Sequence, residues 1–148
     1  MEDKYYVPEL QELHVDFPYE EIRNGEWVKI NDFSNAYDYE DSCLYGFIKA
    51  LEAGKIRVKY LDAEDIVECG LKQYYPDDYN HGLVFKTTSK VIRGEEREVI
   101  IIYIPNTRHL LVSVDARNDY KDGRDITLYA GQCKNKSKLK QILKDLGI

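Results

Sequence analysis

Five arginines in the second half of the chain carry the side chain best suited to bind a phosphate or another anion. A guanidinium group can donate two parallel hydrogen bonds to a phosphate, and these arginines fall near predicted strand ends and turns. Five lysines crowd the last predicted helix and its lead-in, either as part of an anion site or as the solvated face of the helix. The candidate anion-binding residues are Arg93, Arg97, Arg108, Arg117 and Arg124.

The first half of the chain carries a different pattern, in which tyrosines alternate with acidic residues. Residues 1–80 contain 19 Asp and Glu against 8 Lys and Arg, and they hold ten of the 13 tyrosines. Tyrosine is enriched at protein interfaces, and spaced carboxylates can imitate phosphates in a basic groove of a partner. Solvated loops are the alternative interpretation. The candidate protein-contact residues are Tyr37, Asp38, Tyr39, Glu40, Asp41, Tyr74, Tyr75, Asp77 and Asp78.

The sequence lacks the motifs that common enzyme chemistry requires. Its nine glycines form no GxGxxG or GxxxxGK phosphate loop. His14, His81 and His109 lie far apart. Asp77, Asp78 and His81 share one predicted loop, where solvated acids are the favoured interpretation over a site for a hard cation. The strands after Pro76-Asp77 lack the lysine that a PD-(D/E)xK nuclease uses beside its metal. We therefore predict no catalytic residue, no metal site and no cofactor, although groups that meet only in space are not tested by spacing.

Length and composition predict one domain, residues 1–148, with a core large enough to be stable without disulfides or a structural metal. Three cysteines without a CxxC pair favour a reducing compartment, and the N-terminus does not resemble a signal peptide. The longest apolar run, Val99–Pro105, is far shorter than a membrane span. We expect a cytoplasmic protein without a membrane partner. A net charge of −6 argues against nucleic acid as a partner, because domains that bind it are usually basic.

Patterns in the first half predict a hairpin followed by short helices and a strand. Alternating apolar residues over 13–17 and a second run over 26–30 flank Asn24-Gly25, and both residues of this turn tolerate a positive φ. An apolar stripe predicts a helix that begins after Ser42 and ends near Gly54. A strand over 56–60 and a helix over 63–69, capped by Asp62, follow.

The second half predicts a four-stranded antiparallel meander and a C-terminal helix. The strand over 98–104 is rich in β-branched residues, which indicates burial on both faces for much of its length. A stripe that includes Leu143 predicts that the last helix, capped by Ser137, packs on the sheet. The predicted class is α+β: an antiparallel β-meander packed against a C-terminal helix, plus the N-terminal hairpin and one or two further helices. The other strands are expected over 83–92, 110–114 and 126–130.

The uneven distribution of charge along the chain predicts two separate surfaces. Residues 1–80 have a net charge of −11, and residues 81–148 have a net charge of +5. We expect a negative surface made by residues 32–41 and 62–78, apart from a positive surface around the last helix. Charge arranged in this way would steer a partner.

Three stretches together resemble uncharacterised small proteins encoded by phages and prophages of gut bacteria of the Bacteroides group. They are KYYVPELQELHVDF at 4–17, IRVKYLDAEDIVECG at 56–70 and KNKSKLKQILKDLGI at 134–148. The resemblance implies a phage setting and no particular reaction. We therefore expect a non-enzymatic accessory protein that binds and inhibits a host component or a component of anti-phage defence. Two alternatives stay open: a sequestering binder of a small anionic nucleotide signal, and a hydrolase of such a nucleotide.

Overall fold

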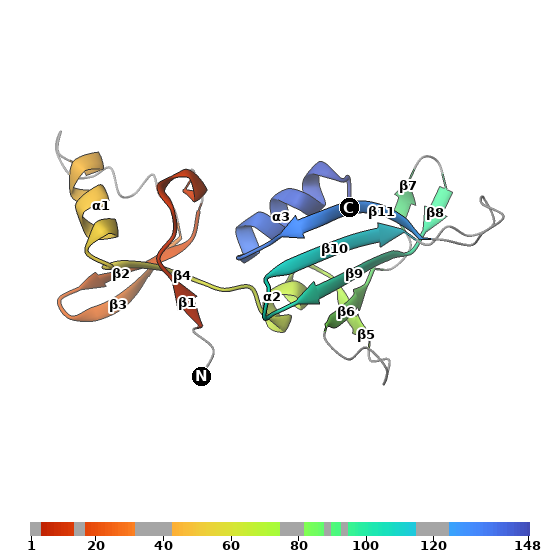
Figure 1. The fold of residues 1–148 in the computed structure, drawn as a ribbon, viewed down its shortest axis with the longest axis horizontal. Coiled ribbons are helices and arrows are strands. Elements are labelled where there is room, and N and C mark those ends of the chain that lie inside the picture. Colours follow the sequence, from red (N-terminus) through yellow and green to blue (C-terminus); the bar gives the residue numbers. More distant parts are fainter. Residues whose placement is uncertain are drawn as a thin grey trace. The chain divides into compact units, whose positions relative to one another are not determined.

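The computed structural model of the chain contains two compact units, residues 1–60 and residues 61–148 (Figure 1). Each has a sheet and a hydrophobic core of its own, and the prediction of a single domain stays a prediction. The structure describes residues 4–13, 17–31, 43–74, 82–87, 90–92, 95–114 and 125–148.

The N-terminal unit is built on a four-stranded antiparallel sheet with the strand order β1-β4-β2-β3. The predicted Asn24-Gly25 turn is confirmed, since both residues have a positive φ, 53° and 87°. The first arm of the hairpin differs from the prediction, because it follows Pro18, and Leu13 and Phe17 lie outside any strand. The elements are β1 (Tyr5–Tyr6), the 3-10 helix η1 (Leu10–Glu12), β2 (Tyr19–Arg23), β3 (Glu26–Ile30), α1 (Cys43–Glu52) and β4 (Ile56–Lys59).

The helix α1 packs on one face of this sheet. Phe47 of the helix meets Tyr19 of β2 edge to face, with ring centroids 5.7 Å apart, and Ile56 and Val58 of β4 join them. The helix ends as predicted, with Gly54 in the left-handed region at φ 66°. Because side chains alternate along a strand, burial of one set leaves the other set of β4 residues on the opposite face.

The C-terminal unit is built on a five-stranded antiparallel sheet with the order β11-β10-β9-β6-β5. The four-strand meander is confirmed, but the fifth strand, β5, was not predicted. The predicted strand over 83–92 is wrong as one element: its first part joins the large sheet, and its second part pairs in a separate two-stranded sheet. The elements are α2 (Ala63–Glu68), β5 (Lys72–Tyr74), β6 (Leu83–Lys86), β7 (Lys90–Ile92), β8 (Glu95–Arg97), β9 (Val99–Ile104), β10 (His109–Val114), β11 (Ile126–Gln132) and α3 (Lys136–Asp145).

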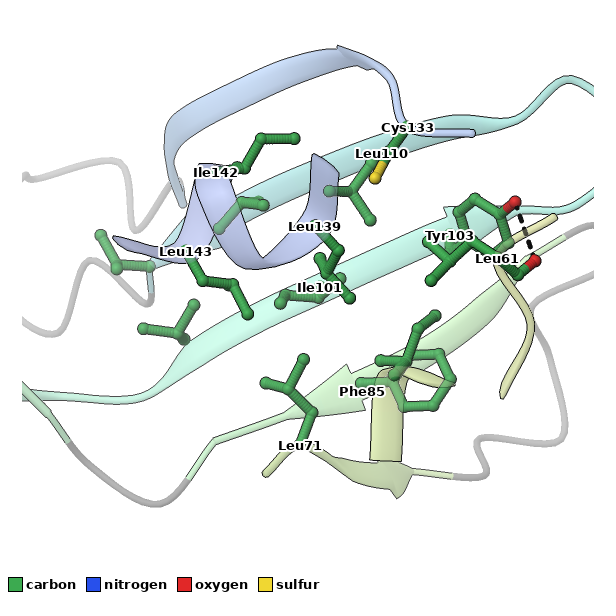
Figure 2. Close-up of a cluster of buried hydrophobic side chains, with 14 residues drawn as sticks. Leu61, Leu71, Phe85, Ile101, Tyr103, Leu110, Cys133, Leu139, Ile142 and Leu143 are labelled. Atoms are coloured by element: carbon green, nitrogen blue, oxygen red, sulfur yellow. Dashed lines mark hydrogen bonds between the residues drawn. The ribbon is translucent and has the colours of Figure 1, made fainter. Parts of the chain in front are cut away.

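The core of this unit lies between the sheet and the helices α2 and α3 (Figure 2). Leu139 and Leu143 of α3 are buried against it, as predicted from their helical spacing. The prediction that β9 is buried on both faces for much of its length is wrong. Ile101 and Tyr103 are fully buried, whereas Ile102 between them is only half-buried. The reason is that α2 and α3 pack on the same face, so the central strand has one fully covered side.

The helix caps test a local prediction in each half. The Asp62 cap is confirmed: its Oδ1 accepts a hydrogen bond from the Asp65 N–H at 3.0 Å. The Ser137 cap is wrong, because α3 begins two residues earlier, after Asn135. The Asn135 side chain accepts a hydrogen bond from the Lys138 N–H at 2.9 Å and is almost fully buried. Extended backbone at Asn135 places its oxygen over the first turn, which is the geometry a capping residue needs.

Candidate functional site

Two of the five candidate anion-binding arginines lie in the described part of the chain, and the structure does not bring them together. Arg97 ends β8, just before β9, and Arg108 follows the turn after β9. A six-residue strand separates their backbones by roughly 20 Å, too far for both guanidiniums to hold one small anion. The Arg108 side chain hydrogen-bonds Tyr103, whose pKa is raised mainly by burial. Arg93, Arg117 and Arg124 lie outside the described residues.

Of the candidate protein-contact residues, the structure describes Tyr74 alone. This tyrosine of β5 is 51% exposed, and the Lys86 ammonium lies 4.3 Å from its ring centroid. Lys86 also approaches Glu98, with 3.5 Å between Nζ and Oε2. Tyr74 is therefore on an accessible surface, next to paired charges. Tyr37, Asp38, Tyr39, Glu40, Asp41, Tyr75, Asp77 and Asp78 lie outside the described residues.

The predicted separation of acidic and basic surfaces is wrong where the structure can test it. Lys136 of the basic helix α3 hydrogen-bonds Glu68 of α2 and lies 3.9 Å from Asp65. The hydrogen bond with Glu68 raises the pKa of Lys136. The boundary between the units explains the error: residues 1–60 hold 13 acids and 7 Lys and Arg, whereas residues 61–148 hold 14 of each. Acids of the region 62–78 thus share a unit with the basic helix.

Two described cysteines are poor candidates for a nucleophile. Cys133 is fully buried, and burial raises its pKa to about 12. Burial also raises the pKa of the half-buried Cys69 thiol. The thiolate is the reactive form, so both environments disfavour attack at neutral pH. Within the described residues, no three His, Cys, Asp or Glu side chains gather where they could hold a metal ion. The same residues include no helix long and apolar enough to cross a membrane.

The best-formed site among the described residues is the face of the N-terminal sheet opposite α1. The pairing register brings side chains from all four strands to this face, because Glu20 stands opposite Arg57 and Ile22 opposite Trp27. Tyr5 of β1 stands opposite Lys59 and so joins the same face. We call this surface the Arg57 face. Its members are Tyr5, Glu20, Ile22, Trp27, Lys29, Arg57 and Lys59.

Arg57 is held between two aromatic rings at the centre of this face. Its guanidinium carbon lies 3.8 Å from the Tyr5 ring centroid and 4.0 Å from the Trp27 ring centroid. Its Nε donates to Glu20 Oε2 at 2.7 Å, and its Nη2 lies at the same distance from that oxygen. Each cation–π contact contributes on the order of 0.5–2 kcal/mol. Two rings and a carboxylate therefore fix a side chain that would otherwise sample many rotamers.

The residue types on the Arg57 face suit contact with another molecule. The described strand residues of the Arg57 face include no Ser, Thr, Cys or His that could act as a nucleophile or a histidine base. They do combine Trp, Tyr and Arg, the three residue types that most often dominate the energy of protein interfaces. Alternation in the sequence IRVK indicates that Arg57 faces away from the core. Its neighbours Tyr5 and Trp27 were missed, because only strand register brings them together.

Comparisons of the chain with protein-family models, with curated proteins and with solved structures found no match.

Proposed function

We propose that the protein is a non-enzymatic binding factor that engages a partner protein through the Arg57 face. The supporting observation is the Arg57 guanidinium clamped between Trp27 and Tyr5 and anchored on Glu20. A side chain fixed before binding loses little rotamer entropy when the partner arrives, so more of the contact energy is retained as affinity. The rings add apolar area, and exposed Lys29 adds positive charge at the rim.

The setting of this function remains part of the proposal. The phage-protein resemblance suggests that the partner is a host component or a component of anti-phage defence, and that binding inhibits it. The two nucleotide alternatives stay predictions. The two described arginines of the predicted anion site lie at opposite ends of β9 and give these alternatives no support. A protein partner is favoured because the triad of Trp, Tyr and Arg matches the composition of interface hot spots.

Substitutions on and off the Arg57 face test the proposal. Wild-type protein, Trp27→Ala and Tyr45→Ala are immobilised and incubated with lysate of a Bacteroides-group bacterium. Tyr45 is 67% exposed on α1, so its variant removes an equally accessible aromatic ring elsewhere in the same unit. A partner that uses the Arg57 face is recovered by wild type and Tyr45→Ala and lost with Trp27→Ala. Titration of that purified partner should show binding weakened at least about 30-fold, as expected for a hot spot worth 2 kcal/mol or more.

A conservative variant separates stacking from charge. Arg57→Lys keeps the positive charge beside Glu20 but loses the planar group that both rings contact. Under this proposal binding weakens and the unfolding temperature falls modestly, because the lost contacts with Tyr5 and Trp27 also stabilise the folded chain. Recovery of every lysate protein equally by wild type and Trp27→Ala would refute it. The wild-type protein is also incubated with cyclic and linear nucleotides and then heat-denatured: released intact ligand favours the sequestering alternative, and cleaved ligand makes the protein a hydrolase.

A further inference from the structure

Within the described residues, the outer edge of β3 presents backbone groups that no other strand pairs, beside the Arg57 face. Ile22 of β2 donates its N–H to the Lys55 carbonyl at 3.0 Å, so the even-numbered residues of β2 direct their polar groups away from β3. In an antiparallel pair, the β3 residues that stand opposite these β2 residues also direct their N–H and carbonyl groups away from the partner strand. Trp27 stands opposite Ile22, and Lys29 stands opposite Glu20. Both therefore point one N–H and one carbonyl outward from the sheet, and within the described residues β3 pairs with β2 alone.

The side chains of these same two residues lie on the Arg57 face. An extended segment that hydrogen-bonds to Trp27 and Lys29 would thus place every second side chain next to the indole and the ammonium group. On the reverse face of β3, Val28 is 38% exposed and would be covered by the side chain between them. One added strand would hydrogen-bond the outward backbone groups of Trp27 and Lys29. It would also cover Val28 and bring side chains next to the indole and the ammonium group.

The other strand edges of the two main sheets are less suited to this pairing. β1 has two residues and β5 has three, which offers few hydrogen bonds. β11 has seven residues, but its Gln132 carbonyl already accepts a hydrogen bond from the Tyr129 hydroxyl at 3.0 Å. The Tyr129 ring also lies close over Gly131, where an added Cβ would meet its hydroxyl at 2.9 Å. Among the described strands of the two main sheets, β3 is the edge where unpaired backbone groups and a preformed side-chain site coincide.

From this coincidence we infer that β3 receives an extended, acidic segment of the partner protein as an added antiparallel strand. The inference rests on the proposed function and specifies its partner. Antiparallel pairing sets the order of the segment: an acid opposite Lys29, then an apolar residue over Val28, then an apolar or aromatic residue opposite Trp27. The recognised pattern is acid-apolar-aromatic in an otherwise unstructured stretch.

A synthetic peptide with this pattern provides the probe. The peptide Thr-Val-Glu-Val-Tyr-Val-Thr carries fluorescein and is titrated with the full chain by fluorescence anisotropy. Methylation of the Glu and Tyr nitrogens blocks the groups that face β3, whereas methylation of the central Val nitrogen blocks a group that faces away. We expect saturable binding of the parent peptide and of the Val-methylated peptide, and at least tenfold weaker binding of the Glu,Tyr-methylated peptide.

Variants of Lys29 test the same pairing from the protein side. Lys29→Pro removes an N–H that the β2–β3 ladder does not use, and proline is tolerated on edge strands with that orientation. Lys29→Ala keeps the N–H and removes the side chain beyond Cβ, including its charge. We expect Lys29→Pro to bind the parent peptide at least tenfold more weakly than Lys29→Ala, with both variants unfolding at similar temperatures.

The outcomes separate this inference from the proposed function. Equal binding by the two Lys29 variants, equal binding of the two methylated peptides, or no saturable binding of the parent peptide overturns strand addition. If lysate binding still depends on Trp27 in that case, the Arg57 face stands and the edge does not. If peptide binding depends on the Lys29 N–H but not on the Trp27 ring, strand addition stands and the proposed role of the face fails.

Discussion

Truncation of Leu143 to alanine tests whether α3 holds the C-terminal unit together. Leu143 is 7% exposed and packs in the cluster that α3 shares with β9 and β10. Removing its branched end takes away about three carbon groups, worth roughly 2.4 kcal/mol of transfer free energy at about 0.8 kcal/mol each. The cavity left behind adds to this cost, so a loss of about 3–4 kcal/mol is expected, within the range of about 2–5 kcal/mol for such sites.

A loss of this size is large for a unit that spans residues 61–148. Domains have a total stability of about 0.05–0.15 kcal/mol per residue, which gives roughly 4–13 kcal/mol here. Domains of this size lose about 4–8 °C in Tm per kcal/mol, so Leu143→Ala should lower the transition by roughly 12–30 °C.

Urea unfolding followed by far-UV circular dichroism measures the effect. Lys144→Ala is the matched control, because the neighbouring side chain is exposed and surface changes usually stay within about 0.5 kcal/mol. Amide hydrogen exchange in β9 and β10 locates the loss, since these strands form the floor on which α3 packs. If Leu143→Ala and Lys144→Ala unfold at the same urea concentration, the assignment of α3 to this core is wrong.

Five further substitutions have defined outcomes. Asn135→Ala should cost about 1 kcal/mol through loss of the α3 cap, whereas Ser137→Ala should stay within about 0.5 kcal/mol, both measured by urea unfolding. Cys133, with a folded pKa of about 12 against an ordinary 9.0, contributes stability that is complete below pH 9 and declines between pH 9 and about 12. Cys133→Ala should therefore flatten the fall in unfolding free energy between pH 8 and pH 11, and an unchanged slope would contradict the assigned burial. Gly25→Ala should lose about 1–2 kcal/mol at its φ of 87°, but Gly46→Ala, with open space around a helical site, should gain about 0.5–1 kcal/mol in thermal unfolding.

Local patterns in the sequence predicted the parts of the fold that depend on neighbouring residues. The stripe on α3 follows from helical spacing, and the turn at Asn24-Gly25 follows from two residues that accept a positive φ. The break after Lys86 was missed, because residues 83–92 contain no proline or glycine to mark the change of sheet. β5 was missed because three residues are too few to establish a period.

The candidate site depended on information that no single segment contains. Arg57 belongs to β4, yet its two rings come from β1 and β3, at Tyr5 and Trp27. Which residues become neighbours is set by strand order and register, and a shift of one residue would send Arg57 to the other face. The charge argument failed for the same reason, since Lys136 and Glu68 are far apart in the chain but meet between two helices. Local composition could not show either contact.

The position of Trp27 provides an intrinsic fluorescent probe of the Arg57 face. It is the single tryptophan of the chain, so emission excited selectively in the indole comes from one ring. That ring already lies against a guanidinium, a charged neighbour that influences the energy of the excited indole. A ligand that covers the remaining surface of the ring would remove water from it and shift its emission to shorter wavelength. Occupancy can therefore be followed by intrinsic fluorescence, without a label and on the unmodified protein.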